Sequence, residues 1–359
     1  MFVVGSRLRV SRTTVVGMAF NLVADGDWAF TDSEASELAA KVLKAHRDVF
    51  GSMPAKQSTL ILLPFQGLLA DRWSAETRGS TVTLLMGQIP SKVAALVRLS
   101  TPLTHELFHF WVPNGLALND DYDWFYEGFT VYQAARTAVR LDLLSLPEFL
   151  NAIARAYDGY VAGVDHDRWS LVEASQRRWT VGESSVYSKS MVVAFLYDLK
   201  LRSQSHGKRS LDDVYRRLFQ HYHSSDPASS TLLNEGDGND GVMNVLAGES
   251  MSQDFVQRFI RNPVAINLQA ELEPFGLRAE NGGFCSTADR LLQGDTSCGF
   301  PGHDESRRPF PPSVYRRRVY SADLELTSSA PVRPHSHSDR SPARRCLRSA
   351  FPGLPDHKA

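Results

Sequence analysis

Cysteine is nearly absent from this chain of 359 residues. The three cysteines, Cys285, Cys298 and Cys346, all lie in its last 75 residues. Every residue before Cys285 therefore belongs to a region with no cysteine nucleophile and no cysteine metal ligand, and disulfide bonds cannot stabilise that region.

Long apolar runs and an excess of charge of one sign are also absent. No apolar run reaches the roughly 18 residues that a membrane-spanning helix needs. The formal net charge is −1 and the sequence pI is about 6.8, which favours neither nucleic acid nor an anionic membrane surface as a partner. We therefore expect no nucleic-acid partner and no membrane span, and the sequence does not predict an oligomeric state.

The amino-terminal stretch MFVVGSRLRVSRTTVVGMAF does not match a signal peptide, because arginines interrupt its apolar residues. The sequence as written therefore predicts a cytoplasmic protein. If the amino terminus is truncated, a periplasmic location is possible instead.

Histidine and glutamate supply the strongest signal in the chain. Residues 105–109 read His-Glu-Leu-Phe-His, and side chains four positions apart lie on one face of a helix, so His105 and His109 can bind one ion. Zinc binds neutral imidazole nitrogens and carboxylate oxygens, and a catalytic zinc site leaves one position to water. Glu106 lies beside the ion in this pattern and can take a proton from that water.

Glu127, in the context Tyr-Glu-Gly-Phe-Thr, is the predicted third zinc ligand on the following helix. Ser100-Thr101-Pro102 predicts the start of the first helix and Pro113-Asn114-Gly115 its end. Asp120 and Asp121 are predicted to cap the second helix. Alternatively, the histidines belong to the core and Glu127 is a surface carboxylate, although buried aromatic-rich helices rarely carry such groups without a partner.

The pattern of apolar residues predicts an α+β fold, with a small N-terminal sheet followed by a mostly helical region. Strands are predicted at 13–24, 58–65 and 80–87. Capping boxes at 31–34 and 145–148 predict helices to about Phe50 and Val161. Further helices are predicted near 184–202, 209–223 and 252–261.

Three regions follow from this pattern. Residues 1–30 are predicted to be a partial N-terminal β region, and residues 31–280 the catalytic domain. Residues 281–359 are rich in Ser, Pro, Arg and Gly and lack the periodicity of a core, so they are predicted to be a disordered low-complexity tail.

The segments HELFHFW, WFYEGFT and VYSKSMVVAFLYDLKLR together resemble the M61 glycyl aminopeptidase family of gluzincin metallopeptidases, which is related to the M1 aminopeptidases. The resemblance spans roughly residues 13–280. It implies a thermolysin-like gluzincin catalytic domain, one Zn²⁺ per chain and a peptide substrate with a small N-terminal residue. Family members usually carry a β-rich domain before this region and a PDZ domain after it, so the chain resembles a truncated form.

The resemblance also implies a catalytic tyrosine. In these families a Tyr-x-Lys-Gly segment stands opposite the metal, and here it corresponds to Tyr187, Lys189 and Ser190, with serine in place of glycine. A phenol O–H directed at a developing oxyanion stabilises the transition state. The alternative is a packing residue at the start of a helix.

A weaker match lies upstream, where the family has Gly-Gly-x-Glu-His. The corresponding residues 74–81 read SAETRGST, which keep the glutamate as Glu76 but lack both glycines and the histidine. The resemblance implies that Glu76 binds the free α-amine of the substrate, because a carboxylate paired with an ammonium group would fix the scissile bond one residue away. A solvated loop residue is the alternative.

Together these observations predict a zinc-dependent metallopeptidase that removes small N-terminal residues. His105, His109 and Glu127 bind zinc, Glu106 and Tyr187 are catalytic, and Glu76 binds substrate. Two alternatives stay open: a zinc endopeptidase, and an inactive zinc-bearing peptide-binding protein or truncated relic.

Overall fold

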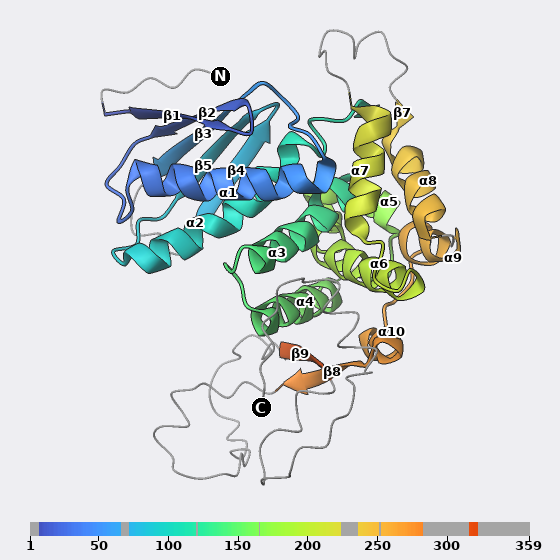
Figure 1. The fold of residues 1–359 in the computed structure, drawn as a ribbon. Helices are drawn as coiled ribbons and strands as arrows, with labels where there is room; N and C mark the ends of the chain where they lie inside the picture. Colours follow the sequence, from blue (N-terminus) through green and yellow to red (C-terminus); the bar gives the residue numbers. More distant parts are fainter. Residues whose placement is uncertain are drawn as a thin grey trace, which may run out of the picture.

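The structure is a computed structural model that describes residues 7–65, 72–119, 121–164, 166–223, 236–250, 253–282 and 316–321. A small sheet near the amino terminus lies beside a mostly helical remainder (Figure 1). This arrangement confirms the predicted α+β class.

The sheet has five strands in the order β1-β2-β3-β5-β4. Their bounds are Arg9–Val15 (β1), Met18–Ala24 (β2), Gln57–Pro64 (β3), Trp73–Arg78 (β4) and Thr81–Met86 (β5). The three central strands are parallel to one another, and β1 and β4 pair antiparallel with their neighbours. β4 is therefore an edge strand with one side unpaired in this sheet.

The predicted strands at 58–65 and 80–87 are confirmed as β3 and β5, but the single strand predicted at 13–24 is wrong. It is the turn and second half of a hairpin, because Val16 and Gly17 both adopt positive φ, 49° and 82°. Two consecutive residues of positive φ form the tight turn that matches the twist of paired strands. The preceding residues, including the exposed Arg9 and Arg12, form the outer strand β1.

Two helices cover one face of the sheet (Figure 1). α1 runs from Asp32 to Phe50, and both hydrogen bonds of the predicted capping box between Thr31 and Glu34 are present. α2 runs from Lys92 to Glu106. α1 contacts β1 and β2, and α2 contacts β4 and β5.

The predicted start of α2 at Ser100-Thr101-Pro102 is wrong. The helix begins nine residues earlier, where the Ser91 side chain accepts a hydrogen bond from the Ala94 amide. Ser100 is buried and its hydroxyl donates to the Val97 carbonyl within the helix. Pro102 is an interior residue of this helix, so here proline does not mark a first turn.

The helical remainder contains the predicted helices at about their expected places. The bounds are η1 Phe108–Phe110, η2 Trp124–Phe129, α3 Thr130–Arg140, α4 Leu146–Val161, α5 Leu171–Ser175, η3 Arg178–Gly182, η4 Ser185–Lys189, α6 Ser190–Gln204, α7 Leu211–Tyr222, α8 Gly238–Ser250, α9 Gln253–Val256, η5 Gln257–Arg261, α10 Leu268–Leu272 and η6 Glu273–Phe275. The capping box predicted at Ser145 and Glu148 is present. No helix in the described ranges is both long and apolar enough to cross a bilayer.

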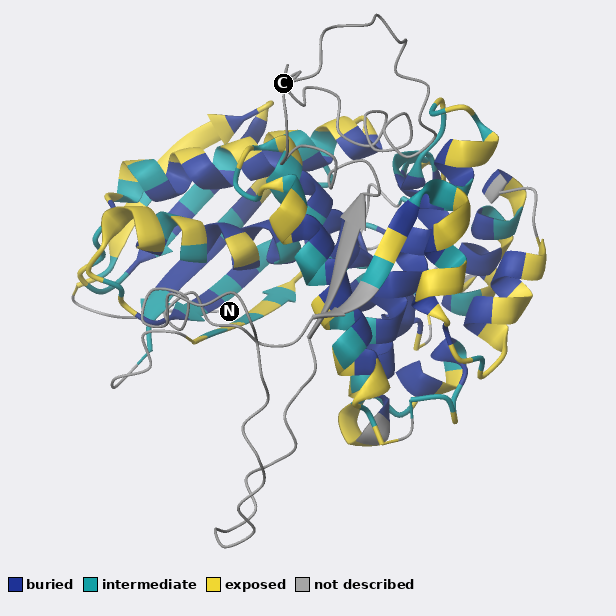
Figure 2. Cartoon of the chain, turned by 90° about the horizontal axis from the view of Figure 1, so that it is seen from below, coloured by how far each residue is buried: buried dark blue, intermediate teal, exposed yellow. Residues whose placement is uncertain are grey.

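One hydrophobic core joins the sheet to the helices (Figure 2). Its buried residues come from β2, β3 and β5 and from the helices α1 to α8 alike. The strands β1 and β2, which lie in the predicted partial region 1–30, pair into the same sheet as β3. Within the predicted tail, Arg316–Ser321 forms strand β9, antiparallel to β8 (Leu277–Gly282); a strand here was not predicted. β6 (Leu118–Asn119) and β7 (Gly236–Asp237) form a two-residue pairing.

Candidate metal centre

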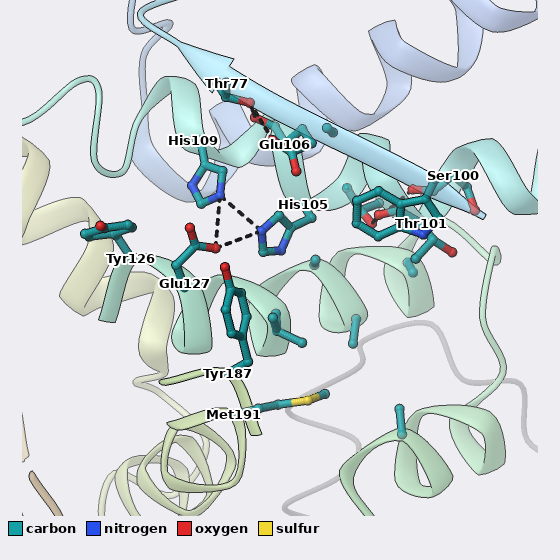
Figure 3. A pocket seen from close by; sticks show the side chains of 18 of the residues that line it. Thr77, Ser100, Thr101, His105, Glu106, His109, Tyr126, Glu127, Tyr187 and Met191 are labelled. Atoms are coloured by element: carbon teal, nitrogen blue, oxygen red, sulfur yellow. Dashed lines mark hydrogen bonds and ion pairs between the residues drawn. The ribbon is translucent and has the colours of Figure 1, made fainter. Parts of the chain in front are cut away.

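His105, His109 and Glu127 converge on one point (Figure 3). The Nε2 atoms of the two histidines are 3.1 Å apart. Oε2 of Glu127 lies 3.2 Å from Nε2 of His105 and 3.6 Å from Nε2 of His109. The three ligand atoms all lie within 4.8 Å of one another, and no other such group of His, Cys, Asp or Glu occurs among the described residues.

The end of α2 and the turn after it place the two histidines. His105 lies in the last turn of α2, and His109 lies in the tighter turn η1. Leu107, Phe108 and Trp111 between and after them have no exposed surface. Burial of these apolar side chains fixes the helix end in the core, so the two imidazoles face the same side.

Glu127 comes from η2, where the backbone forms a wider, π-helical turn. Trp124, Phe125 and Phe129 of this turn are fully buried and pack against one another with ring centroids 5.0 to 5.6 Å apart. Wider turns of this kind occur often at functional sites. Asp121 does not cap this turn, because the residue before it is Asp123, which makes no capping hydrogen bond. The other predicted cap, Asp120, lies outside the described residues.

The hydrogen bond of His109 on its other ring nitrogen suits a metal ligand. Its Nδ1 lies 2.8 Å from the Val112 carbonyl oxygen, an acceptor that requires a proton on Nδ1. In the neutral imidazole this leaves a lone pair on Nε2, the atom that faces His105 and Glu127. The tautomer of His109 is thus the one that a metal needs.

Charge within the cluster opposes the effect of burial. Burial alone would raise the pKa of Glu127, but hydrogen bonds and charge from His105 and His109 outweigh it and lower the pKa below its usual range. Burial alone would lower the pKa of His109, and Glu127 reverses this and raises the pKa. A metal would replace the proton that the carboxylate favours on the imidazole, so metal binding would release protons.

Glu106 is held by a hydroxyl from the edge strand. Thr77 on β4 donates to Oε2 of Glu106 at 2.6 Å, and the same hydroxyl lies 3.2 Å from the Glu106 carbonyl oxygen. Glu106 is only 6% exposed. Figure 3 shows Thr77 and Glu106 on the strand side of the ligand cluster and Tyr187 on the opposite side.

Tyr187 lies on η4 with its hydroxyl directed at the cluster (Figure 3). Burial and then the charge of Glu127 raise the pKa of Tyr187, against an opposing effect of Arg178. The phenol therefore keeps its proton at neutral pH and can donate a hydrogen bond. Lys189 is buried with its Nζ 5.1 Å from the centre of the Tyr160 ring, and burial lowers its pKa to about 8.

Ser190, at the end of the predicted catalytic segment, packs closely against Gly128. Ser190 is fully buried and its hydroxyl donates to the Ser185 carbonyl. A Cβ on Gly128 would lie 2.2 Å from the Cβ of Ser190 and 2.3 Å from the Val186 carbonyl oxygen. The absence of a side chain at Gly128 lets η2, with Glu127, approach η4, with Tyr187.

A cavity of about 920 Å³ contains the cluster. Its lining includes His105, Glu106, His109, Glu127 and Tyr187, together with Trp73 to Thr77 of the edge strand β4. The unpaired side of an edge strand can accept an extended peptide as an added strand. All the predicted ligands and catalytic residues thus face one cavity.

Glu76 lines the same cavity but is already paired. Its carboxylate accepts from Arg78 at 2.6 Å and 2.7 Å, and the two side chains are 61% and 83% exposed. The structure places Glu76 inside strand β4. It is therefore neither a loop residue nor a contact of the ligand cluster.

Arg178 is a residue of this site that the sequence did not reveal. Its guanidinium donates to Oε1 of Glu127 at 2.9 Å and to Asp123 at 2.6 Å, and it contacts the Tyr187 hydroxyl. Asp123 and Asp121 are the described aspartates just before the turn η2, and of these two Asp123 is the one that contacts Arg178. Arg178 precedes Tyr187 by nine positions in a segment with no recognisable pattern, so no sequence signal pointed to it.

Comparison with known proteins supports the fold. The structure is similar to an aminopeptidase N family protein from Idiomarina loihiensis, with a TM-score of 0.64 and 19% sequence identity over 76% of this chain and 50% of that chain. An M1 zinc metallopeptidase from Deinococcus radiodurans has a TM-score of 0.49 and 15% identity over 73% of this chain and 53% of that chain. No protein-family model and no curated protein matches the sequence. The chain spans about half the length of the solved structures that it resembles.

Proposed function

We propose that this chain is a zinc-dependent metallopeptidase, and more narrowly an aminopeptidase that removes small N-terminal residues. The observation that carries the proposal is the convergence of His105, His109 and Glu127 beside Glu106 in a cavity bordered by an edge strand. The fold likeness to an aminopeptidase N family protein agrees with it.

The donor set fits zinc. Two imidazole nitrogens and one carboxylate oxygen are the ligands of a catalytic zinc site, and the Val112 carbonyl already selects the required tautomer of His109. We infer one Zn²⁺ per chain. When bound, zinc would polarise a carbonyl and lower the pKa of a water to roughly 7.

Glu106 is the proposed general base. Thr77 occupies its Oε2, and Oε1 has no hydrogen-bond partner among the described residues. Oε1 can therefore take a proton from the attacking water and deliver it to the leaving amine. Tyr187, protonated at neutral pH, donates to the oxyanion from the opposite side of the ligand cluster.

The peptide substrate would lie along β4. Its backbone would pair with the free side of the strand. Its α-ammonium group would take the place of Arg78 beside the Glu76 carboxylate. An exposed ion pair contributes about 0–1 kcal/mol, so this exchange costs little. Together with the motifs, this arrangement supports a gluzincin related to the M61 family, with a thermolysin-like catalytic domain over roughly residues 31–280.

A zinc endopeptidase is the second candidate, and the Glu76–Arg78 ion pair is the observation that favours it. With its charge balanced by Arg78, Glu76 attracts an N-terminal ammonium less strongly. A substrate could then extend past this point along the strand.

Hydrolysis of a panel of aminoacyl-arylamides by zinc-loaded protein tests the proposal, with an internally quenched, N-acetylated peptide beside it. We expect the arylamides with glycine or alanine to be cleaved, and Glu106→Gln to bind zinc but cleave nothing. Cleavage of the blocked peptide alone would establish the endopeptidase. Folded protein with one zinc that cleaves neither class of substrate would contradict both and leave the inactive peptide-binding form.

A further inference from the structure

Arg178 lies where three parts of the proposed site meet. Its side chain is only 14% exposed. Nη2 lies 2.9 Å from Oε1 of Glu127 and also contacts the Tyr187 hydroxyl, and Nη1 lies 2.6 Å from Oδ1 of Asp123. One guanidinium therefore links a metal ligand, the proposed oxyanion donor and a buried carboxylate.

The two oxygens of Glu127 have different partners. Oε2 faces His105 and His109 at 3.2 and 3.6 Å, whereas Oε1 is bonded to Arg178. A carboxylate can bind a metal through one oxygen or through both. Because Arg178 occupies Oε1, Glu127 presents a single oxygen to the site.

Asp123 fixes the arginine in turn. Asp123 is 5% exposed and immediately precedes the wide turn η2, four positions before Glu127. The guanidinium is planar and rigid, so binding one carboxylate through Nη1 determines where Nη2 points. Burial strengthens this arrangement because an unpaired charge would be costly here.

Tyr187 is oriented by the same group. Arg178 donates to the phenol oxygen, and its guanidinium carbon lies 5.2 Å from the centre of the Tyr187 ring. Because the phenol oxygen accepts from Arg178, the proton of the phenol remains free to be donated to another acceptor.

We propose that Arg178 is a positioning residue that restricts Glu127 to one ligating oxygen and orients the phenol of Tyr187 toward the metal site. This inference rests on the proposed zinc site. It explains how a coordination position can stay open to water, because a second oxygen from Glu127 would fill it.

Cobalt-substituted protein gives a readout that does not depend on turnover. Four-coordinate Co²⁺ absorbs visible light more strongly than five- or six-coordinate Co²⁺. Arg178→Gln removes both the planar guanidinium and its charge. Arg178→Lys keeps the charge but not the planar guanidinium. Arg177→Gln is the matched control, because the adjacent Arg177 lies 4.2 Å over the Trp169 ring and bonds to the Glu173 carbonyl instead.

We expect Arg178→Gln and Arg178→Lys to bind one cobalt with clearly weaker visible absorption than the wild type, and Arg177→Gln to match the wild type. The zinc forms of both Arg178 variants should lose kcat on the order of 10- to 100-fold, the usual effect of removing a group that orients a metal ligand. A merely structural ion pair would change the melting temperature and leave the spectrum unaltered.

Folded Arg178→Gln with a wild-type cobalt spectrum would overturn the inference. Should that variant not fold, Asp123→Ala keeps the arginine and removes the carboxylate that accepts from its Nη1, and an unaltered spectrum there would overturn it equally. Wild-type protein that binds no cobalt and no zinc would overturn the proposed function itself, which is a different result.

Discussion

Among single residues, Thr77 has the most specific contact with the proposed chemistry, because its hydroxyl bonds to the carboxylate of Glu106 at 2.6 Å. It comes from a strand 29 positions earlier in the chain. In strand β4 it follows Glu76, so the two side chains point to opposite faces of the strand. Thr77 contacts Glu106, and Glu76 pairs with the exposed Arg78.

Replacing Thr77 by valine should therefore lower kcat without loss of zinc. Valine has the same shape but no hydroxyl, so the Glu106 carboxylate loses the contact that fixes its rotamer. Misplacement of a catalytic group by about 1 Å can cost about 100-fold in rate. Steady-state kinetics would check this, with Thr77→Ser as the control that keeps the hydroxyl and most of the rate. Equal kcat for Thr77→Val and wild type would refute the role of Thr77.

His46 gives the fold a dependence on pH. It is fully buried on α1 and bonds to the Thr104 carbonyl, and burial lowers its pKa from 6.5 to about 3. Between these values only the unfolded chain binds the extra proton. The free energy of unfolding must therefore fall as pH falls through this window.

Urea denaturation at pH 7.5 and at pH 5 measures the effect. Between pH 7.5 and pH 5 the free energy of unfolding of the wild type should fall by about 2 kcal/mol more than that of His46→Gln, because one site binds a proton only in the unfolded chain. His221→Gln alters an exposed histidine on α7 and should leave the wild-type dependence intact. The same loss in all three proteins would show that His46 is not responsible.

Local spacing predicted which side chains would meet at the proposed metal site, whereas the contacts between distant segments could not be predicted from the sequence. His105, Glu106 and His109 lie within one helical turn and a half, where spacing alone determines which side chains share a face. Arg178 and Glu127 are 51 positions apart, and only the packing of η3 beside η2 joins them. No periodicity encodes such a contact.

Between elements, the close approach of η2 and η4 has the clearest consequence. It needs Gly128, because an added Cβ would lie 2.2 Å from Ser190 and 2.3 Å from the Val186 carbonyl. The two turns carry Glu127 and Tyr187, so their separation determines the geometry of the site.

Gly128→Ala should lower the free energy of unfolding by about 1–3 kcal/mol, the usual cost of overpacking. It should also reduce activity, because Tyr187 moves away from Glu127. Adding Ser190→Gly should restore only part of the stability, since the contact with the Val186 carbonyl persists. Gly248→Ala is the control: no atom lies within 4 Å of its added Cβ, and alanine favours a helix. Equal stability of the two alanine variants in chemical denaturation would exclude a steric role of Gly128.

A buried ion-pair network joins α3, α6 and α7 behind the site. Arg136 of α3 is fully buried and bonds to Asp212 of α7, and its Nη1 lies 3.8 Å from Asp198 of α6. Asp198 also accepts from Tyr132 and Arg202.

Asp198→Ala should destabilise the fold by about 3–5 kcal/mol, because it breaks a buried ion pair by removing the carboxylate that accepts from Tyr132 and Arg202. Asp48→Ala removes an exposed partner of Arg47 and should cost about 1 kcal/mol or less. Thermal denaturation of both variants checks the contrast. If Asp198→Ala lowers the melting temperature no more than Asp48→Ala does, the network does not stabilise the helices.

Element boundaries were predictable where a local hydrogen bond defines them. The capping boxes at Thr31 and Ser145 placed α1 and α4 to the residue. Pro102 misled because a proline normally marks the first turn of a helix, whereas here the helix continues through it into the core. The hairpin turn at Val16 and Gly17 was missed because valine rarely adopts positive φ.

In the whole molecule, the sheet and the helices share one core. The cluster of His105, His109 and Glu127 lies in a cavity beside the edge strand β4 (Figure 3). The α+β class was predictable because strands precede helices along the chain. Which edge of the sheet borders the cavity was not predictable, since strand order depends on pairings such as that of β3 with β5. That pairing brings β4 to the edge and Thr77 to Glu106.

The central claim is that these residues form a zinc-dependent catalytic site. Titration of metal-free protein with zinc, with bound metal and peptide hydrolysis measured on the same samples, tests it most directly. We predict that hydrolysis rises in proportion to bound zinc up to one ion per chain, and that Glu106→Gln binds the same amount without turnover. Hydrolysis that is independent of zinc, or that persists in Glu106→Gln, would contradict the claim.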